Sequence, residues 1–246
     1  MHVYYDDARD IKAIIQTLTK LVDEALFEIK PEGIKLTAVD RAKISLINID
    51  LPAEMFKEYE VQEEYKFGFN TQYMSKLMKA VKGKQAISLD ADNEEVVKLT
   101  IIGAINRDFN IRNIQVLPPE IPEANFEFDV KASISSKGLK TAISEVSQVS
   151  KDSVTIYANE EKVVIRGGEE SKVESEFTKE TGALADIEFT KEATATYDIN
   201  YIDNVLQLTK LSDYTKLAFS DQKPLQMEFS MEGGGKVTYL LAPKLS

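Results

Sequence analysis

The chain has 246 residues, of which 41 are acidic and 30 basic, so its formal net charge is −11. It contains no cysteine and a single histidine, His2, which excludes disulfides, thiolate nucleophiles and zinc sites built from cysteine and histidine. A Ser-His-Asp triad would depend on His2, which we expect at a frayed terminus.

Four helices are predicted in chain order, because apolar residues recur there at i, i+3, i+4 and i+7. They span residues 10–22, 72–84, 136–149 and 199–211, and the apolar stripe of the last helix is the least regular. Alternation of apolar and polar residues predicts strands between the helices. These strands span residues 25–30, 34–39, 44–51, 86–90, 96–102, 108–116, 154–158, 162–166, 172–177, 217–220, 225–231 and 236–241.

The same order of elements occurs twice along the chain. A shift of 128 residues places Ile11 on Leu139 and Leu21 on Val149, so the first helix of each half carries a similar apolar stripe. Between the halves, three prolines within residues 116–125 favour an extended connector. We therefore predict two similar domains, residues 1–116 and 126–246, joined by a connector at residues 117–125.

The charges are distributed unevenly between helices and strands. The four helical windows together carry +6, which leaves −17 for the rest of a chain whose total is −11. If the four helices line one face, their lysines would make that face positive on an otherwise acidic protein. Lysines suit phosphate contacts that do not depend on base sequence. The alternative is that these lysines form the ordinary solvated side of each helix.

No motif for catalysis or cofactor binding is complete in this sequence. Residues 232–236 contain three glycines before Lys236, but Val237 stands where a phosphate-binding loop needs serine or threonine. The run therefore fits a turn between two strands. We expect no carboxylate in an apolar setting that would raise its pKa, and no acidic pair has calcium-loop spacing. The sequence thus predicts no catalytic residue, no metal site, no cofactor and no enzymatic activity.

No apolar run approaches the ~18–20 residues that span a bilayer, and the first residues lack the basic and apolar regions of a signal peptide. We expect a protein of a reducing compartment without a membrane partner.

Three segments together resemble the sliding-clamp family, proliferating cell nuclear antigen, and most closely its archaeal members. They are residues 33–46, 121–123 and 240–244. The resemblance implies an α+β DNA clamp fold with two βαββ units in each domain, in a trimeric ring with helices lining the hole and sheets outside. It implies a processivity factor for DNA replication and repair, located in the cytoplasm at the nucleoid in an archaeon, or in the nucleus of a eukaryote.

The resemblance also implies the partners. Double-stranded DNA would thread the ring without sequence preference, and a clamp loader would open and close it. DNA polymerase, flap nuclease and ligase would bind through short client peptides. The other two subunits would be copies of this chain or paralogues, and the sequence leaves that choice open.

Residues of three surfaces are implied by the same resemblance. The DNA-facing lysines are Lys12, Lys76, Lys79 and Lys210, to which position on the same helices adds Lys20, Lys82, Lys137 and Lys140. The groove for client peptides consists of Val39, Lys43, Ile44, Leu46, Ile121, Pro122, Phe126, Pro224, Leu241, Ala242, Pro243 and Lys244. The subunit interface pairs residues 109–115 with 172–178 of a neighbour, and its residues are Phe109, Ile111, Asn113, Lys172, Val173, Ser175 and Phe177.

Three other functions remain as alternatives. One is a checkpoint-type clamp subunit that works in a mixed ring. Another is an acidic protein-interaction scaffold without a DNA role, although lysines on all four helices argue against it. The third is an enzyme that uses paired carboxylates, which turnover or stabilisation by a metal would reveal.

Overall fold

The computed structural model describes residues 1–121, 126–168 and 172–244. The chain divides into two compact units. Unit 1 consists of Met1–Arg41, Ile47–Glu120 and Ser230–Val237. Unit 2 consists of Ala42–Leu46, Ile121–Phe229 and Thr238–Ser246. Among the described residues, no helix is long and apolar enough to cross a membrane.

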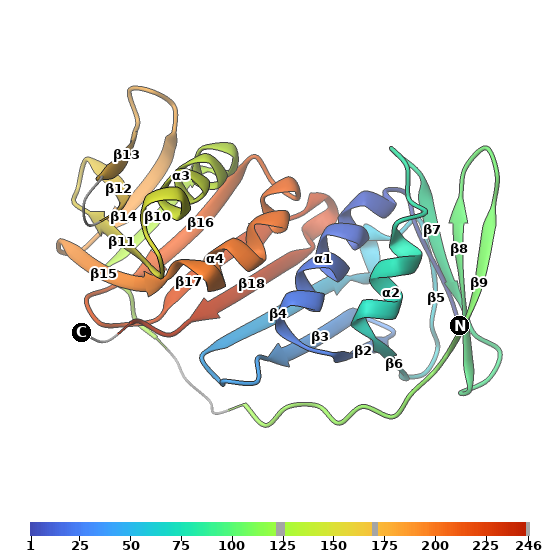
Figure 1. Ribbon diagram of the computed structural model, residues 1–246. Helices are drawn as coiled ribbons and strands as arrows, with labels where there is room; N and C mark the ends of the chain where they lie inside the picture. The colour runs from blue at the N-terminus through green and yellow to red at the C-terminus, as the bar shows by residue number, and fades with distance from the viewer. Residues whose placement is uncertain (122–125, 169–171, 245–246) are drawn as a thin grey trace. The chain divides into compact units, whose positions relative to one another are not determined.

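The first half of the chain holds two α-helices, one short 3-10 helix and nine strands. In chain order they are β1 His2–Tyr5, α1 Ala8–Leu21, β2 Glu24–Lys30, β3 Gly33–Val39, β4 Ser45–Pro52, η1 Ala53–Met55, β5 Glu58–Glu60, β6 Tyr65–Asn70, α2 Thr71–Met78, β7 Ala86–Asp90, β8 Val96–Ile102 and β9 Arg107–Arg112. The strands lie in the orders β5-β1-β7-β8-β9 and β4-β3-β2-β6. In unit 1, α1 and α2 lie side by side on one face, with strands behind them (Figure 1).

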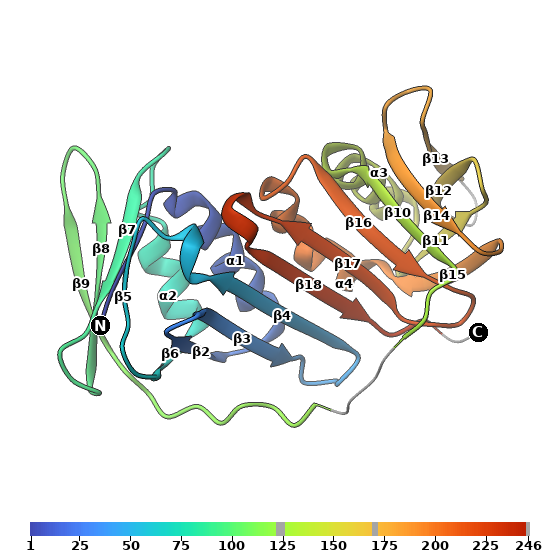
Figure 2. The ribbon, with the colours of Figure 1, turned by 180° about the vertical axis from the view of Figure 1, so that it is seen from behind.

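The second half repeats this plan. Its elements are β10 Val130–Ser135, α3 Ser136–Val149, β11 Ser153–Ala158, β12 Lys162–Gly167, β13 Val173–Thr178, β14 Leu184–Phe189, β15 Ala193–Asp198, α4 Ile199–Val205, η2 Leu206–Lys210, β16 Tyr214–Phe219, β17 Leu225–Ser230, η3 Glu232–Gly234 and β18 Lys236–Leu241. Its strands lie in the orders β14-β10-β16-β17-β18 and β13-β12-β11-β15. Seen from behind, the strands of each unit lie in front of its helices (Figure 2).

The internal repeat predicted from the sequence is confirmed at the level of elements. Helices α1 and α3 both have 14 residues, and their first residues, Ala8 and Ser136, are 128 positions apart. Helices α2 and α4 begin at Thr71 and Ile199, again 128 positions apart. The predicted α+β fold with two similar halves is therefore confirmed.

A short polar side chain starts each helix directly after a strand or turn. Asp7, Asn70, Ser135 and Asp198 each accept a hydrogen bond from a backbone N–H in the first turn of the helix that follows. These bonds satisfy amide groups that have no partner inside the helix. The four capping residues also fall in pairs 128 positions apart, so the repeat extends to the helix starts.

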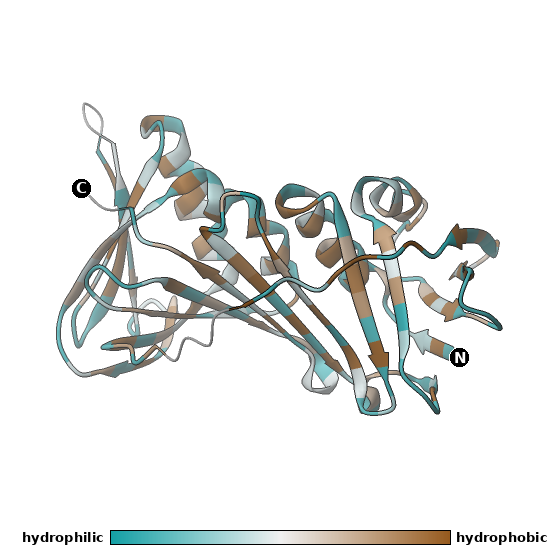
Figure 3. Cartoon of the chain, turned by 90° about the horizontal axis from the view of Figure 1, so that it is seen from below, coloured by the Kyte–Doolittle hydropathy of each residue, from teal (hydrophilic) through white to brown (hydrophobic). Residues whose placement is uncertain are grey.

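The core of each unit is built where a helix stripe meets the inner face of strands. In unit 1, Ile14 and Leu18 are fully buried, as are Phe67 and Phe69, whose ring centroids lie 5.3 Å apart. In unit 2, Ile143 and Val146 are fully buried, as is Phe219. Apolar and polar residues alternate along the strands in bands (Figure 3), as expected when one strand face is buried.

Two predicted helices are shorter than the apolar pattern indicated. Helix α2 ends at Met78. The amides of Ala80 and Val81 then donate to the carbonyl oxygens three residues earlier, as in a 3-10 turn. These turns keep a spacing of apolar residues similar to that of a helix, although the α-helix has ended. Gly83, with φ of 67°, then reverses the chain. The window 199–211 divides into α4 and the 3-10 helix η2, consistent with its irregular stripe.

The predicted strand at residues 108–116 is also too long, because β9 ends at Arg112. Six strands that the pattern did not predict are present, namely β1, β5, β6, β10, β14 and β15. The expected turn at residues 232–236 is present, with Gly233 and Gly234 at positive φ. The predicted domain boundaries at residues 116 and 126 stay a prediction.

Candidate functional site

The lysines predicted to face DNA in unit 1 differ in how free their ammonium groups are. On α1, Lys20 is exposed, whereas Lys12 is half-buried and its Nζ donates to the carbonyl oxygen of Val81 at 3.1 Å. Lys76 is exposed on α2. Lys79 and Lys82 are exposed beyond the end of α2, so their predicted place on the helix is corrected.

In unit 2, Lys137 and Lys140 are exposed on α3, away from its buried residues. Lys210 is exposed at the end of η2, and its Nζ donates to Oε1 of Gln207 at 2.6 Å. Thr141, Ser144 and Gln148 on α3 add no positive charge, so this helix contributes two lysines.

Many lysines on strands, in contrast, are neutralised by a carboxylate. Lys98 on β8 lies 2.8 Å from Asp108 and Lys216 on β16 lies 3.0 Å from Glu228. Lys35, Lys131 and Lys162 on other strands also have carboxylate partners. Within the described ranges, no carboxylate oxygen lies within 4.0 Å of the helix-associated amines of Lys20, Lys76, Lys79, Lys82, Lys137 and Lys140. Six lysines on and beside the helices thus carry uncompensated positive charge, as do Lys66 on β6 and Lys236 on β18 among the described residues.

Several residues of the predicted groove belong to unit 2. Ile44 is 37% exposed and Phe126 39% exposed, which is high for large apolar side chains. The ring centroids of Phe126 and Phe128 lie 6.1 Å apart. Beside Pro224, Nζ of Lys223 donates to the carbonyl oxygen of Glu127 at 2.7 Å, which ties the β16–β17 turn to the segment that carries Phe126.

Residues 242–244, which we name the strap, follow β18 and are tied to unit 2 by their backbone. The amide of Ala242 donates to the carbonyl oxygen of Ile44 at 2.8 Å, and the amide of Lys244 donates to that of Thr196, also at 2.8 Å. Ala242 and Pro243 are half-buried and Lys244 is exposed. Of the predicted groove residues, Ile44 is thereby bonded to the strap, and Lys43 and Leu46 lie in the same short segment of unit 2, Ala42–Leu46.

Some predicted groove residues are not part of this surface. Leu241 is 1% exposed, so its side chain belongs to the core and cannot contact a peptide. Val39 lies in unit 1, at the end of β3. Ile121 is 44% exposed at the start of unit 2. Pro122 lies outside the described residues.

The two strands predicted to form the subunit interface are each the last strand of their sheet. Strand β9 is the last strand in the order β5-β1-β7-β8-β9 of unit 1, and β13 is the outermost strand in the order β13-β12-β11-β15 of unit 2. Their backbones are therefore positioned for pairing, and Phe109, Val173 and Ser175 are half-buried while Lys172 is exposed. Ile111 and Phe177, in contrast, are 2% and 3% exposed, so their side chains fill the core of their own units.

Asn113 has a different role from the one predicted for its side chain. Its Oδ1 accepts from the amide of Gly68 at 2.9 Å, and its Nδ2 donates to the carbonyl oxygens of Lys66 and Glu94 at 2.8 and 2.9 Å. Asn113 therefore fastens the segment after β9 to β6 inside unit 1, and its hydrogen-bonding groups are already used.

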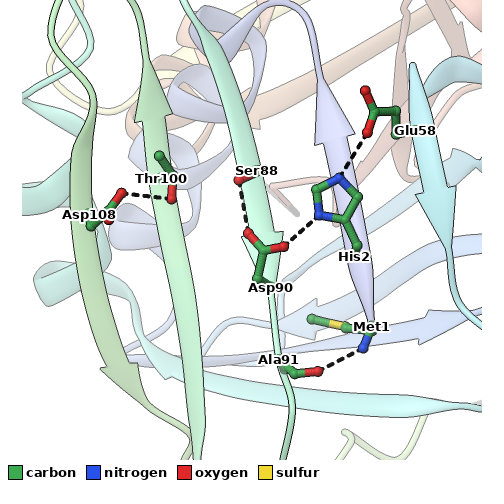
Figure 4. A network of polar contacts seen from close by, with 8 residues as sticks. All are labelled: Met1, His2, Glu58, Ser88, Asp90, Ala91, Thr100 and Asp108. Carbon is green, nitrogen blue, oxygen red and sulfur yellow. Dashed lines mark hydrogen bonds and ion pairs between the residues drawn. The ribbon is translucent and has the colours of Figure 1, made fainter.

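The expectation of a frayed His2 is wrong. His2 lies in β1, between β5 and β7, and its Nδ1 lies 2.5 Å from Oδ1 of Asp90 while its Nε2 lies 3.2 Å from Oε2 of Glu58 (Figure 4). Hydrogen bonding to Asp90 raises the pKa of His2 above its ordinary value, partial burial opposes the rise, and Glu58 adds to it. Both carboxylates are distant in sequence, so no local pattern could have revealed this cluster.

One carboxylate is buried enough for its pKa to rise, contrary to the sequence-based expectation. Burial raises the pKa of Asp10, against the opposing hydrogen bond that Tyr5 Oη donates to it at 2.6 Å. Asp10 lies in the first turn of α1 beside Asp7, whose charge also raises its pKa. Among the described residues, no group of three histidine or acidic side chains is placed to hold a metal ion.

Models of two protein families match nearly the whole chain. The model of the N-terminal domain of proliferating cell nuclear antigen matches residues 2–116, and that of its C-terminal domain matches residues 120–244. The chain is 69% identical over 246 residues to DNA polymerase sliding clamp 1 of Sulfurisphaera tokodaii, with 100% of both chains covered. It is 59% identical over 248 residues to the protein of the same name from Sulfolobus acidocaldarius, again with 100% of both covered.

The fold is also similar to solved structures. A PCNA2-PCNA3 complex from Sulfolobus tokodaii matches with a TM-score of 0.93 at 28% identity, covering 99% of each chain. The PCNA of Thermococcus kodakaraensis matches with a TM-score of 0.92 at 28% identity, again covering 99% of each chain.

Proposed function

The chain belongs to the proliferating cell nuclear antigen family, and from this premise we propose how its surfaces serve a DNA polymerase sliding clamp. It is a subunit of a clamp that encircles duplex DNA, and it is not an enzyme. The family resemblance and the relatives' names favour this function over the checkpoint-type subunit and over an acidic scaffold. The boundaries we propose are domains at residues 1–116 and 126–246 and a connector at 117–125.

The observation that carries the proposal is the set of helix-associated lysines without a carboxylate partner. Lys20, Lys76, Lys79, Lys82, Lys137 and Lys140 supply charge that can meet phosphate oxygens, with support from Lys12 and Lys210. Contacts of this kind are screened by salt and do not read bases, so they allow a ring to slide. Lys12 contributes less than its position suggests, because its ammonium group already has a backbone partner.

We expect replacement of Lys20, Lys76, Lys137 and Lys140 by glutamine to shorten the DNA products made by a clamp-dependent polymerase. The four changes remove four uncompensated charges from the proposed DNA surface. The matched control replaces the strand lysines Lys35, Lys98, Lys131 and Lys216, whose charges are already paired. Product length on primed circular DNA is the measurement. Equal product lengths for the two variants would refute the assignment of the helix surface.

Client enzymes bind, in this proposal, to the apolar surface of unit 2 around Ile44, Phe126, Pro224 and the strap. An extended peptide can add its backbone beside the strap while its aromatic anchors fill the apolar surface. The clients we propose are DNA polymerase, flap nuclease and ligase, and the clamp loader uses the same kind of contact.

The groove is tested by comparing Ile44→Ala with Leu241→Ala. Ile44→Ala should weaken binding of a synthetic peptide with one aliphatic and two aromatic anchors by about tenfold, with little loss of stability, because the side chain is exposed. Leu241→Ala should mainly lower the free energy of unfolding, by about 2–5 kcal/mol, because it leaves a cavity in the core. Calorimetric titration and thermal unfolding separate the two effects. Unchanged peptide affinity in Ile44→Ala would contradict the groove.

We place the subunit in a trimeric ring in which β9 of one subunit pairs with the β13 position of the next. Both strands end their sheets, which supports edge pairing. The neighbours are copies of this chain or paralogues, and sedimentation of the chain alone distinguishes them, since a trimer requires self-pairing. The relatives are archaeal, so the proposed place of action is the cytoplasm, at the nucleoid.

A further inference from the structure

The strap is held by more than its two backbone bonds. Nζ of Lys244 lies 2.6 Å from Oδ2 of Asp152, in addition to the bond from its amide to the Thr196 carbonyl oxygen. The side chains of Lys244 and Asp152 are 39% and 63% exposed. A strap residue is therefore fixed to unit 2 through both its backbone and its charge.

The anchors themselves are fixed in the fold. Asp152 lies in the turn between α3 and β11, and its carbonyl oxygen accepts from the amide of Ile199 at the start of α4. Thr196 lies within β15, paired with Thr155 of β11, and the two hydroxyl groups are 3.0 Å apart. The strap is thus tied to positions whose own backbones are held by hydrogen bonds.

The strap has no amide donor left for a peptide. The amides of Ala242 and Lys244 are used by Ile44 and Thr196, and Pro243 has none. A peptide that pairs with the strap must therefore donate its own N–H groups to strap carbonyl oxygens. The position and orientation of those oxygens decide how well it binds, and the bonds of the strap to unit 2 set both.

We infer that Asp152 is a positioning residue for client binding, which acts by holding Lys244 and thereby the strap. This inference rests on the proposed groove, and it adds a residue that does not itself contact the peptide. Asp152 lies before β11 and the strap follows β18, so the two are far apart in the sequence and meet only in the folded unit.

The experiment is a charge swap between the two residues. Asp152→Lys and Lys244→Asp, each alone, should weaken binding of the anchor-bearing synthetic peptide about two- to fivefold at low salt, as expected for a partly exposed ion pair. The double variant Asp152→Lys with Lys244→Asp should recover the affinity to within about twofold. High salt should shrink all of these differences, because it screens the pair.

Two controls separate positioning from general effects. Glu160→Lys, in the turn after β11, changes the net charge of the chain by the same amount as Asp152→Lys, and it should leave peptide affinity unchanged. Hydrogen exchange of the Lys244 amide in the absence of peptide should be faster in Asp152→Lys than in the unchanged chain or the double variant. That second measurement reports on the strap itself, independently of the peptide.

Two results would overturn the inference while leaving the groove intact. One is tight binding by the unchanged chain together with unchanged affinity in both single variants. The other is a double variant as weak as Lys244→Asp, which would mean that Lys244 contacts the peptide directly. Absence of binding by the unchanged chain would instead refute the groove, and the inference with it.

Discussion

Many lysine side chains on strands have a different environment from the exposed lysines on helices. Lys216 lies directly opposite Glu228 on the neighbouring strand, and Lys98 reaches Asp108 diagonally, since Asp108 lies opposite Thr100. On α1 and α3, the exposed Lys20 and Lys140 have no such neighbour among the described residues. The same residue type thus serves the solvated surface of the sheets and the proposed DNA surface of the helices.

The pKa of His2 makes a prediction about stability and pH. Because the folded state raises this pKa, the protonated form stabilises the fold fully below the unfolded value of about 6.5, and the contribution disappears as pH rises through the folded value. We expect the free energy of unfolding to fall by a few tenths to about 1 kcal/mol over that range. Denaturant titrations across the range would measure it.

The control for this prediction is His2→Gln, which retains a side chain that hydrogen-bonds but cannot become charged. In this variant, the free energy of unfolding should no longer decrease above pH 6.5 on account of residue 2, while pH-dependent changes due to other groups remain. An identical pH profile for both proteins would show that Asp90 and Glu58 do not stabilise the charged imidazole.

At the level of single residues, the sequence predicted which lysines are exposed, but it did not predict which polar side chains are buried or hydrogen-bonded. The exposed lysines could be predicted because a helix stripe defines which side faces solvent. His2, Asp10 and Asn113 could not, because their partners or their burial depend on strands brought together from distant parts of the chain. Leu241 was placed in the groove by the resemblance alone, whereas the alternation of Val237, Tyr239 and Leu241 along β18 puts it on the buried face.

Among the elements, the segment after β9 shows how an extended stretch is held without a regular ladder. The amide of Ile114 donates to the carbonyl oxygen of Gly68 at 3.0 Å, beside the three bonds of the Asn113 side chain. A Cβ atom at Gly68 would lie 2.0 Å from the Ile114 carbonyl oxygen. Gly68 is therefore required for the close approach of two backbones.

Gly68→Ala should lower the free energy of unfolding by about 1–3 kcal/mol, the range for a side chain forced into a packed region. It should also speed hydrogen exchange at the Ile114 amide, because the two backbones must separate. Gly83→Ala is the comparison, since nothing lies within 4 Å of its Cβ position and only its φ of 67° costs energy, about 1 kcal/mol. Equal exchange at Ile114 in both variants would contradict this role for Gly68.

Helices and strands with a regular spacing of apolar residues were predicted most accurately. Strands β7, β8 and β18 begin and end where alternation predicted, and α3 spans its full predicted window. Strands β1, β5 and β14 were missed because they are short or mostly polar, so pairing with a neighbour, rather than local pattern, makes them strands. Helix α2 was too long in prediction because consecutive 3-10 turns imitate helical spacing.

For the whole molecule, the internal repeat explains how a single chain provides similar surfaces twice. Each half holds two helices and the same five-strand and four-strand orders. In the first half, α1 and α2 contribute lysines; in the second half, α3 and the 3-10 helix η2 do, whereas α4 has none. The net charge of −11 is an average over surfaces of opposite sign, and it did not exclude DNA as a partner.

A closed ring predicts retention on DNA by topology rather than by affinity. After loading onto nicked circular DNA by a clamp loader with ATP, the clamp should survive a high-salt wash that disrupts lysine–phosphate contacts. Cutting the circle once should release it. Gel filtration of DNA-bound protein before and after cutting is the measurement. Retention on linear DNA with free ends would contradict the ring.

The pairing state of the lysines also sets their chemical reactivity. An amine held by a carboxylate is shielded and less nucleophilic than one that is free in solvent, so acylating reagents should modify Lys20 and Lys140 before Lys98 and Lys216. DNA inside the ring would then slow modification of the first pair and leave the second unchanged. The protein thus carries its own set of reporter amines, and mass spectrometry could follow DNA passing through the clamp without any added label.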